Sequence, residues 1–183
     1  TPTPETTPET APETAPAGTS QEGLPEGAVR VGNLPELQAA TSAEASATMI
    51  MVTGTITCDA DPCVRLKAGQ TLMGEEGAVL LADRTNEGDL TTVIELAPDV
   101  SVVGLEISGP DIYTAINGVD AELSGTVLLR DITITSLTNN APITVRDSDA
   151  VGSYTLLIDG LTIAETTRPL GFSDFEGLEL TNS

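Results

Sequence analysis

Short segments in which aliphatic and polar residues alternate recur along the chain from residue 49 onward. One six-residue pattern occurs four times: its second residue is Gly or Asp, followed by an aliphatic residue, any residue and another aliphatic residue. With Gly104, Asp131, Gly160 and Gly177 as markers, the copies lie 27, 29 and 17 residues apart. The first two spacings are typical of solenoid repeats, whereas the short third spacing leaves the last copy either trimmed or incomplete.

Further aliphatic segments lie between the marked copies, at residues 115–116, 127–129, 143–145 and 155–158. Three short strands per repeat, joined by Gly, Asp, Asn and Pro turns, predict one coil of a parallel β-helix with stacked Val, Ile and Leu inside. An antiparallel sandwich also has many short strands, but it does not explain one pattern at near-constant spacing. We therefore expect an all-β, right-handed parallel β-helix, since parallel crossovers strongly favour that hand.

The segment 34–40 precedes the first expected strand and predicts a short helix. Asn33 is suited to cap its amino end, Pro35 fits its first turn, and Glu36 complements its positive end. An alanine-rich stretch at 42–47 would prolong this helix. Because solenoids need a cover over their open edges, we expect the helix to be the N-terminal cap. Strands are expected next at 49–57, 64–66 and 70–74.

The two ends of the chain differ in composition from its centre. Residues 1–28 hold half of the twelve prolines, five Glu and no Lys or Arg, with the near-repeat PETTPETAPETAP. Such a segment buries too little apolar surface to offset its ordering entropy, so it predicts a disordered Thr/Pro/Glu-rich tether before a β-helix at 29–183. No capping segment is visible around Leu180, so we expect the C-terminal end to be uncapped. Either the native chain continues there or another subunit covers that face.

The charge of the chain excludes some classes of partner. Seven Lys and Arg face 28 Asp and Glu, for a net charge of -21, and a surface of this sign repels nucleic acid and anionic membranes. The apolar segments are far shorter than a transmembrane span.

Cys58 and Cys63 flank the loop Asp-Ala-Asp-Pro, whose turn residues favour bringing the two sulfurs together. We expect a disulfide here, and with it an oxidising compartment, which places the protein outside the cell or on its surface. The alternative is a pair of free or buried thiols. Two Cys with no His and no Cys-x-x-Cys spacing disfavour a zinc site.

Candidate metal-binding and catalytic residues are few. Asp147 and Asp149 alternate in a way that suits a calcium site, although turn formation is the usual reason for such a triplet. Calcium is therefore the one cofactor that the sequence brings up. The 28 carboxylates offer too many pairs to point to a glycosidase acid and base, and the basic residues are expected to form surface ion pairs.

Three segments resemble the pectate-lyase-like proteins. Residues 29–40 with 50–56 are similar to the helix and strand that open the right-handed β-helix of that family, residues 64–74 to its next element, and residues 93–107 to one of its rungs. The resemblance spans roughly residues 29–181 and implies the fold. The family's active members place a Trp-Ile-Asp-His segment or a Gly-His-Gly motif on the scaffold, and this chain has neither Trp nor His. No catalytic residue carries over.

Three functions remain open at this point. The first is a non-catalytic structural or interaction module of a secreted or cell-surface bacterial protein, which meets a protein partner or further chain at its C-terminal solenoid end. The second is a lyase or hydrolase of acidic polysaccharides. The third is a carbohydrate-binding module, against which the two Phe, two Tyr and absent Trp count, because sugar rings usually stack on aromatic side chains.

Overall fold

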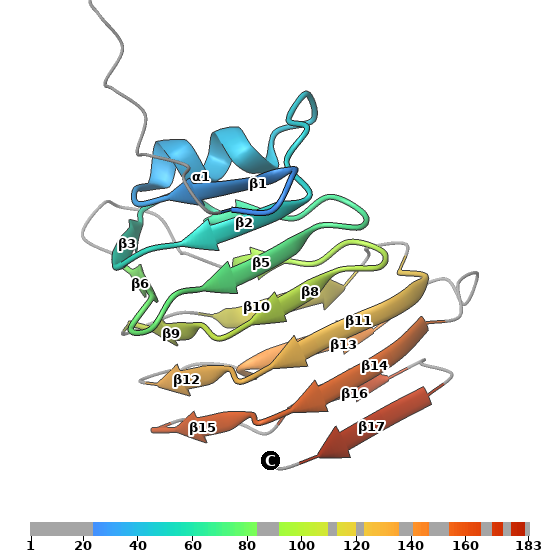
Figure 1. The fold of residues 1–183 in the computed structure, drawn as a ribbon. Coiled ribbons are helices and arrows are strands. Elements are labelled where there is room, and N and C mark those ends of the chain that lie inside the picture. Colours follow the sequence, from blue (N-terminus) through green and yellow to red (C-terminus); the bar gives the residue numbers. More distant parts are fainter. Residues whose placement is uncertain are drawn as a thin grey trace, which may run out of the picture.

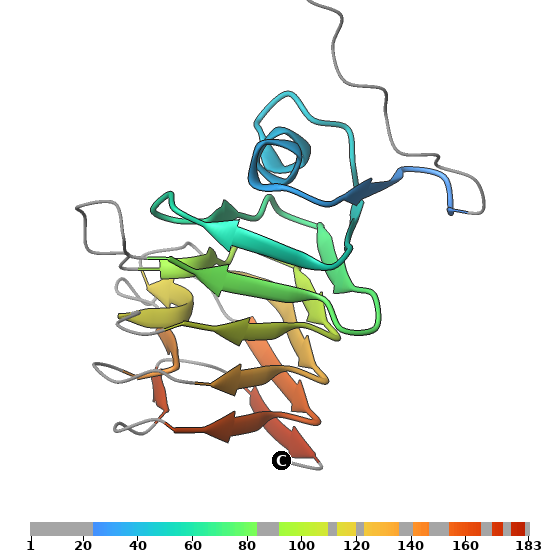
Figure 2. The same cartoon turned by 90° about the vertical axis from the view of Figure 1, so that its left-hand side faces the viewer.

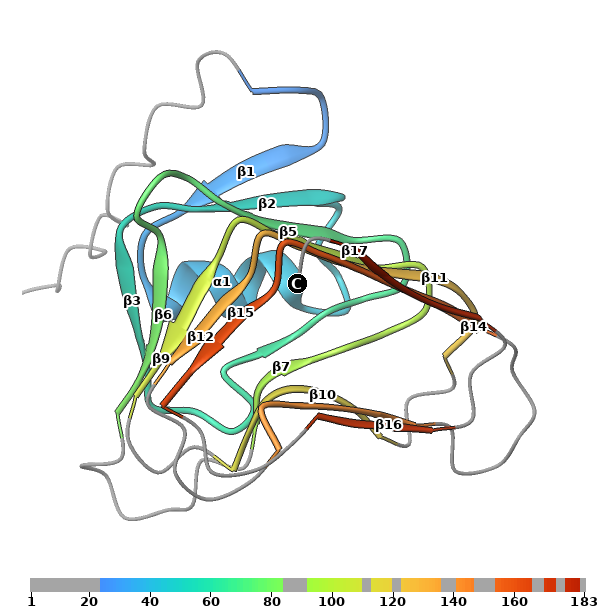
Figure 3. The ribbon, with the colours of Figure 1, turned by 90° about the horizontal axis from the view of Figure 1, so that it is seen from below.

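The computed structural model describes residues 24–83, 92–109, 113–119, 123–135, 141–146, 154–165, 170–173 and 177–181. Within them, short parallel strands stack in three sheets beneath one helix (Figure 1). The chain visits the three sheets in turn and then returns to the first, so the architecture is all-β and solenoid-like. Figure 3, which looks along the stack, shows the sheets as the sides of a prism.

The largest sheet, sheet A, has the order β1-β2-β5-β8-β11-β14-β17. Its strands are β1 (Ala28–Val31), β2 (Met49–Val52), β5 (Thr71–Gly74), β8 (Ser101–Val103), β11 (Gly125–Arg130), β14 (Tyr154–Asp159) and β17 (Gly177–Thr181). Sheet B contains β3 (Thr55–Cys58), β6 (Val79–Ala82), β9 (Glu106–Ser108), β12 (Thr133–Thr135) and β15 (Thr162–Ala164). Sheet C contains β4 (Val64–Arg65), β7 (Thr92–Glu95), β10 (Thr114–Val119), β13 (Ile143–Arg146) and β16 (Gly171–Ser173).

Apolar side chains at equivalent positions of successive coils stack into buried columns. The column of sheet A contains Ile50, Leu72, Val102, Leu129 and Ile158. The column of sheet B contains Ile56, Leu80, Ile107 and Ile134, and that of sheet C contains Val64, Ile94, Ile116 and Ile143. None of these residues is more than 1% exposed. The expected stack of short parallel strands is confirmed, and the parallel pairing of all three sheets excludes an antiparallel sandwich.

Three of the four copies of the sequence pattern occupy equivalent places. Gly104, Asp131 and Gly160 each begin a two-residue corner between a strand of sheet A and a strand of sheet B, with φ angles of 65°, 51° and 69°. The fourth copy, marked by Gly177, is a wrong assignment, because β17 pairs with β14 in sheet A, where Leu180 lies opposite Ile158. The strands of sheets A and B both alternate apolar and polar residues. A six-residue pattern therefore cannot tell to which of the two sheets a strand belongs.

The N-terminal cap has the expected helix, α1 (Leu34–Thr41), across the β1 end of the stack (Figure 2). Asn33 Oδ1 accepts a hydrogen bond from Glu36 N at 3.0 Å, and Glu36 Oε2 accepts one from Gly32 N at 2.9 Å. This reciprocal arrangement satisfies two backbone donors at the start of the helix.

Two expectations near the cap are wrong. The helix does not continue through residues 42–47, because Ser42 at its carboxyl end adopts an extended conformation with φ -60° and ψ 158°. The single strand expected at 49–57 is two strands, β2 and β3, separated by a corner at Gly54. Gly54 has φ 63°, a conformation that glycine adopts without steric cost and that ends a strand.

Gly160→Ala is expected to destabilise the protein more than Gly69→Ala does. Both glycines have positive φ, 69° and 77°, where an alanine costs about 1–2 kcal/mol. A Cβ at Gly160 would also lie 2.5 Å from Asp131 Oδ1, whereas a Cβ at Gly69 meets no atom within 4 Å. Urea unfolding of the two variants measures the cost of the added contact, and equal losses would contradict the packing of this corner.

Candidate functional site

The described residues do not test the calcium site expected at Asp147 and Asp149. Asp147 and Asp149 lie outside the described residues, so their geometry is not part of the structure. In the described ranges, no group of three or more His, Cys, Asp or Glu side chains is placed to hold a metal ion.

The expected disulfide is present. Cys58 and Cys63 are joined by an S–S bond of 2.00 Å, with their Cα atoms 5.2 Å apart. The bond links the end of β3 to the residue before β4, so it closes the corner between sheets B and C. Asp61 Oδ1, in the same loop, accepts a hydrogen bond from Thr92 N at 3.2 Å, which ties the corner to the next coil. The loop therefore has a structural use.

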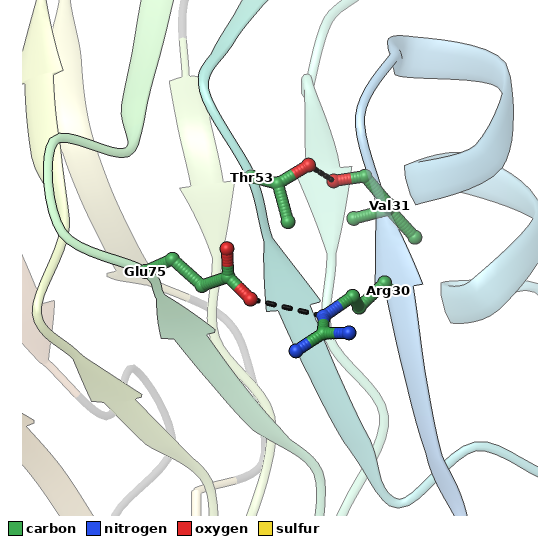
Figure 4. Close-up of polar contacts among 4 residues, drawn as sticks. All are labelled: Arg30, Val31, Thr53 and Glu75. Carbon is green, nitrogen blue, oxygen red and sulfur yellow. Dashed lines mark hydrogen bonds and ion pairs between the residues drawn. The ribbon is translucent and has the colours of Figure 1, made fainter. Parts of the chain in front are cut away.

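Basic residues of the outer faces form ion pairs with carboxylates of neighbouring strands, as expected. Arg30 Nε lies 2.9 Å from Glu75 Oε1 (Figure 4). Arg65 Nη2 lies 2.9 Å from Glu95 Oε2, in register with it on the next strand. A third pair joins Arg130 Nε to Asp159 Oδ2 at 3.8 Å. Because these pairs are partly exposed, each contributes little to stability.

The two ends of the stack differ in how well they cover the core. At the β1 end, α1 lies over the first coil, and its Leu37 is fully buried. At the other end, Leu180 follows Ile158 in the inward column of sheet A, but its side chain is 52% exposed. Ile163, which follows the buried Ile134 in sheet B, is only half-buried. Within the described part of the chain, the core therefore reaches the surface at β17.

The same end presents strand edges. In the described ranges, β17, β15 and β16 are the last strands of sheets A, B and C. An edge strand exposes backbone N–H and C=O groups that can pair with another strand. This surface, made of Leu180, Ile163 and the edges of β15, β16 and β17, is called the open end below. It combines the edges of the last described strands with one exposed apolar side chain, Leu180, and one half-buried apolar side chain, Ile163.

A second apolar surface was not foreseen from the sequence. The outer face of sheet A carries a set of half-buried large apolar side chains that are not packed against the core: Met49, Met51, Met73, Val103, Leu128 and Leu157. The sequence places Met49 and Met51 on the same face of a strand, because they alternate with the apolar Ile50. The position of the others depends on strand register, which the sequence does not show.

No protein-family model, curated protein or solved structure matches the chain. In the described residues, no helix has both the length and the apolar character needed to cross a membrane.

Proposed function

We propose that the chain is a non-catalytic structural or interaction module of a secreted or cell-surface bacterial protein, and that it docks a protein chain at its open end. The observation that carries the proposal is Leu180, which occupies a core position in the register of sheet A and is nevertheless 52% exposed. A protein chain that supplies further strands would bury this side chain and pair the backbone edges at the same time.

The finer fold assignment belongs to the same proposal. We take the three parallel sheets as a right-handed parallel β-helix of the pectate-lyase-like kind. Two observations support it: the order in which the chain visits the sheets, and the corners at Gly104, Asp131 and Gly160, which repeat from coil to coil. The strong preference of parallel crossovers for the right-handed sense supports the hand.

The chemistry of the open end favours a protein over a polysaccharide as its occupant. The two side chains that continue its core columns, Leu180 and Ile163, are aliphatic, and strand edges offer backbone donors and acceptors. Sugar-binding sites usually offer aromatic rings, and strand edges are matched by another polypeptide. The disulfide Cys58–Cys63 is compatible with an extracellular location, because such bonds persist in oxidising compartments.

Site-specific photo-crosslinking tests the docking surface. A photoreactive residue in place of Leu180 is expected to form adducts with one protein species in native envelope extracts. The matched control carries the same group in place of Thr57, which is exposed on the outer face of sheet B, and is expected not to form that adduct. The same adduct pattern at both positions, or none at position 180, would remove the support for a partner at the open end.

The non-catalytic part is tested separately. Polygalacturonate incubated with the protein and calcium is expected to give no rise in the absorbance of unsaturated product. A rise that scales with protein concentration would replace the proposal with that of a polysaccharide lyase.

A further inference from the structure

All three methionines of the chain lie together on the outer face of sheet A. Met49 and Met51 are alternate residues of β2 and flank the fully buried Ile50, so both side chains leave the strand on the outer side. Met73 lies on β5, in register with Met51. All three are half-buried, and none belongs to the side chains packed against the core. Their side chains are therefore partly accessible to solvent.

The spacing of the three residues suits one ligand. Neighbouring strands lie about 4.8 Å apart, and alternate residues of one strand lie roughly 6.6 Å apart. A methionine side chain has three rotatable bonds, so its sulfur can cover such distances. The fourth position of this square is Thr71, in register with Met49, and its side chain is shorter than methionine. Three sulfurs can thus converge on one ion above β2 and β5.

Thioether sulfur is a soft, uncharged donor, and soft donors select Cu(I) over Zn²⁺, Ca²⁺ or Mg²⁺. The chain has no His, and both of its Cys form the disulfide, so other soft donors are absent from the described residues. We propose that Met49, Met51 and Met73 form a binding site for a soft monovalent metal ion, Cu(I) or its analogue Ag(I).

The charges around the site are compatible with a cation. Arg30 is in register with Met51 on the neighbouring strand β1, and its positive charge would oppose a metal ion. Its guanidinium is balanced by Glu75, 2.9 Å away (Figure 4). The net charge of -21 raises the local concentration of cations over the whole surface.

Titration of the full chain with Ag(I) alone tests the site, in a chloride-free buffer without reductant so that the disulfide stays closed. With methionine methyl groups labelled with ¹³C, one equivalent of Ag(I) is expected to shift all three methyl signals together. A competition against bicinchoninate is expected to show one equivalent of bound Cu(I). Zn²⁺ is expected to leave the methyl signals unchanged.

Two variants separate the thioethers from other donors. The triple variant Met49→Leu, Met51→Leu, Met73→Leu keeps side-chain volume, and is expected to lose the one-equivalent binding while keeping the fold. Leu157→Ala, on the same face, is expected to retain it. Unchanged Ag(I) binding by the triple variant, or shifts confined to one or two methyl groups, would overturn the proposal.

Glu75→Gln tests the electrostatic part of the proposal. It leaves the positive charge of Arg30 unbalanced and is expected to weaken Ag(I) binding, and an unchanged affinity would contradict that part.

Discussion

Leu80→Ala is expected to lower the free energy of unfolding by about 2–5 kcal/mol, the range for removing most of a buried leucine side chain. Leu80 is fully buried in the column of sheet B, between Ile56 and Ile107. The neighbouring variant Leu81→Ala removes the same atoms from a half-buried side chain on the outer face of β6. It is expected to cost about 1 kcal/mol or less.

Urea unfolding measures both free energies, with circular dichroism as the signal. The comparison tests strand register, because a shift of one residue exchanges the inner and outer faces of a strand. A larger loss for Leu81→Ala than for Leu80→Ala would contradict the stacking of the columns. A second pair on β11 has the same design: Leu129 is fully buried, and Leu128 is half-buried on the outer face.

Gln70→Leu is expected to have the second large effect, because Gln70 ties the helical cap to the stack. Its side chain is 2% exposed, and its Nε2 donates to the carbonyl oxygens of Ala40 at 3.2 Å and Ala47 at 2.8 Å. Its Oε1 accepts from Lys67 N at 2.9 Å. Leucine leaves these three backbone groups without their partner, and a buried polar group without a partner costs about 1–3 kcal/mol.

The stability lost in Gln70→Leu is expected to be largest around the helical cap. Hydrogen exchange of the backbone amides is expected to accelerate in α1 and in residues 42–47 more than in the strands of later coils. Without Gln70, the side-chain hydrogen bond described between the stack and residues 34–47 is the one that Lys67 Nζ donates to Ala45 O. The matched control is Gln38→Leu, the same change on the exposed side of α1. It is expected to leave exchange near the wild-type rate. Equal acceleration in both variants would show that Gln70 does not hold the cap.

The sequence predicted those parts of the fold that depend on local chemistry. The helix at Leu34 was predictable because a cap, a proline and an acidic first turn lie in adjacent positions. The equivalent places of Gly104, Asp131 and Gly160 in successive coils were predictable because each is followed by the same apolar alternation, although corners at these residues were not predicted. The division of residues 49–57 into two strands at Gly54 was not predictable. A glycine in a strand-like segment marks either a bulge or a corner, and only its φ angle distinguishes the two.

The candidate surfaces divide in the same way. The pairing of Cys58 and Cys63 follows from a short loop with turn residues between them, and it was predicted. The exposure of Leu180 depends on which sheet β17 joins, and the sequence pattern assigned β17 to the wrong sheet. The meeting of Met73 with Met51 requires the register of two strands that are 22 residues apart, and no local signal encodes it.

The position of α1 limits how copies of this chain can assemble. A stack of copies placed head to tail would need the first coil of one molecule to receive the last strand of the next, and α1 with Leu37 already occupies that place. A pair of copies that meet at β17 about a two-fold axis needs no displacement of α1 and closes on itself. The helix thus stands in the way of growth by head-to-tail stacking of copies at the β1 end.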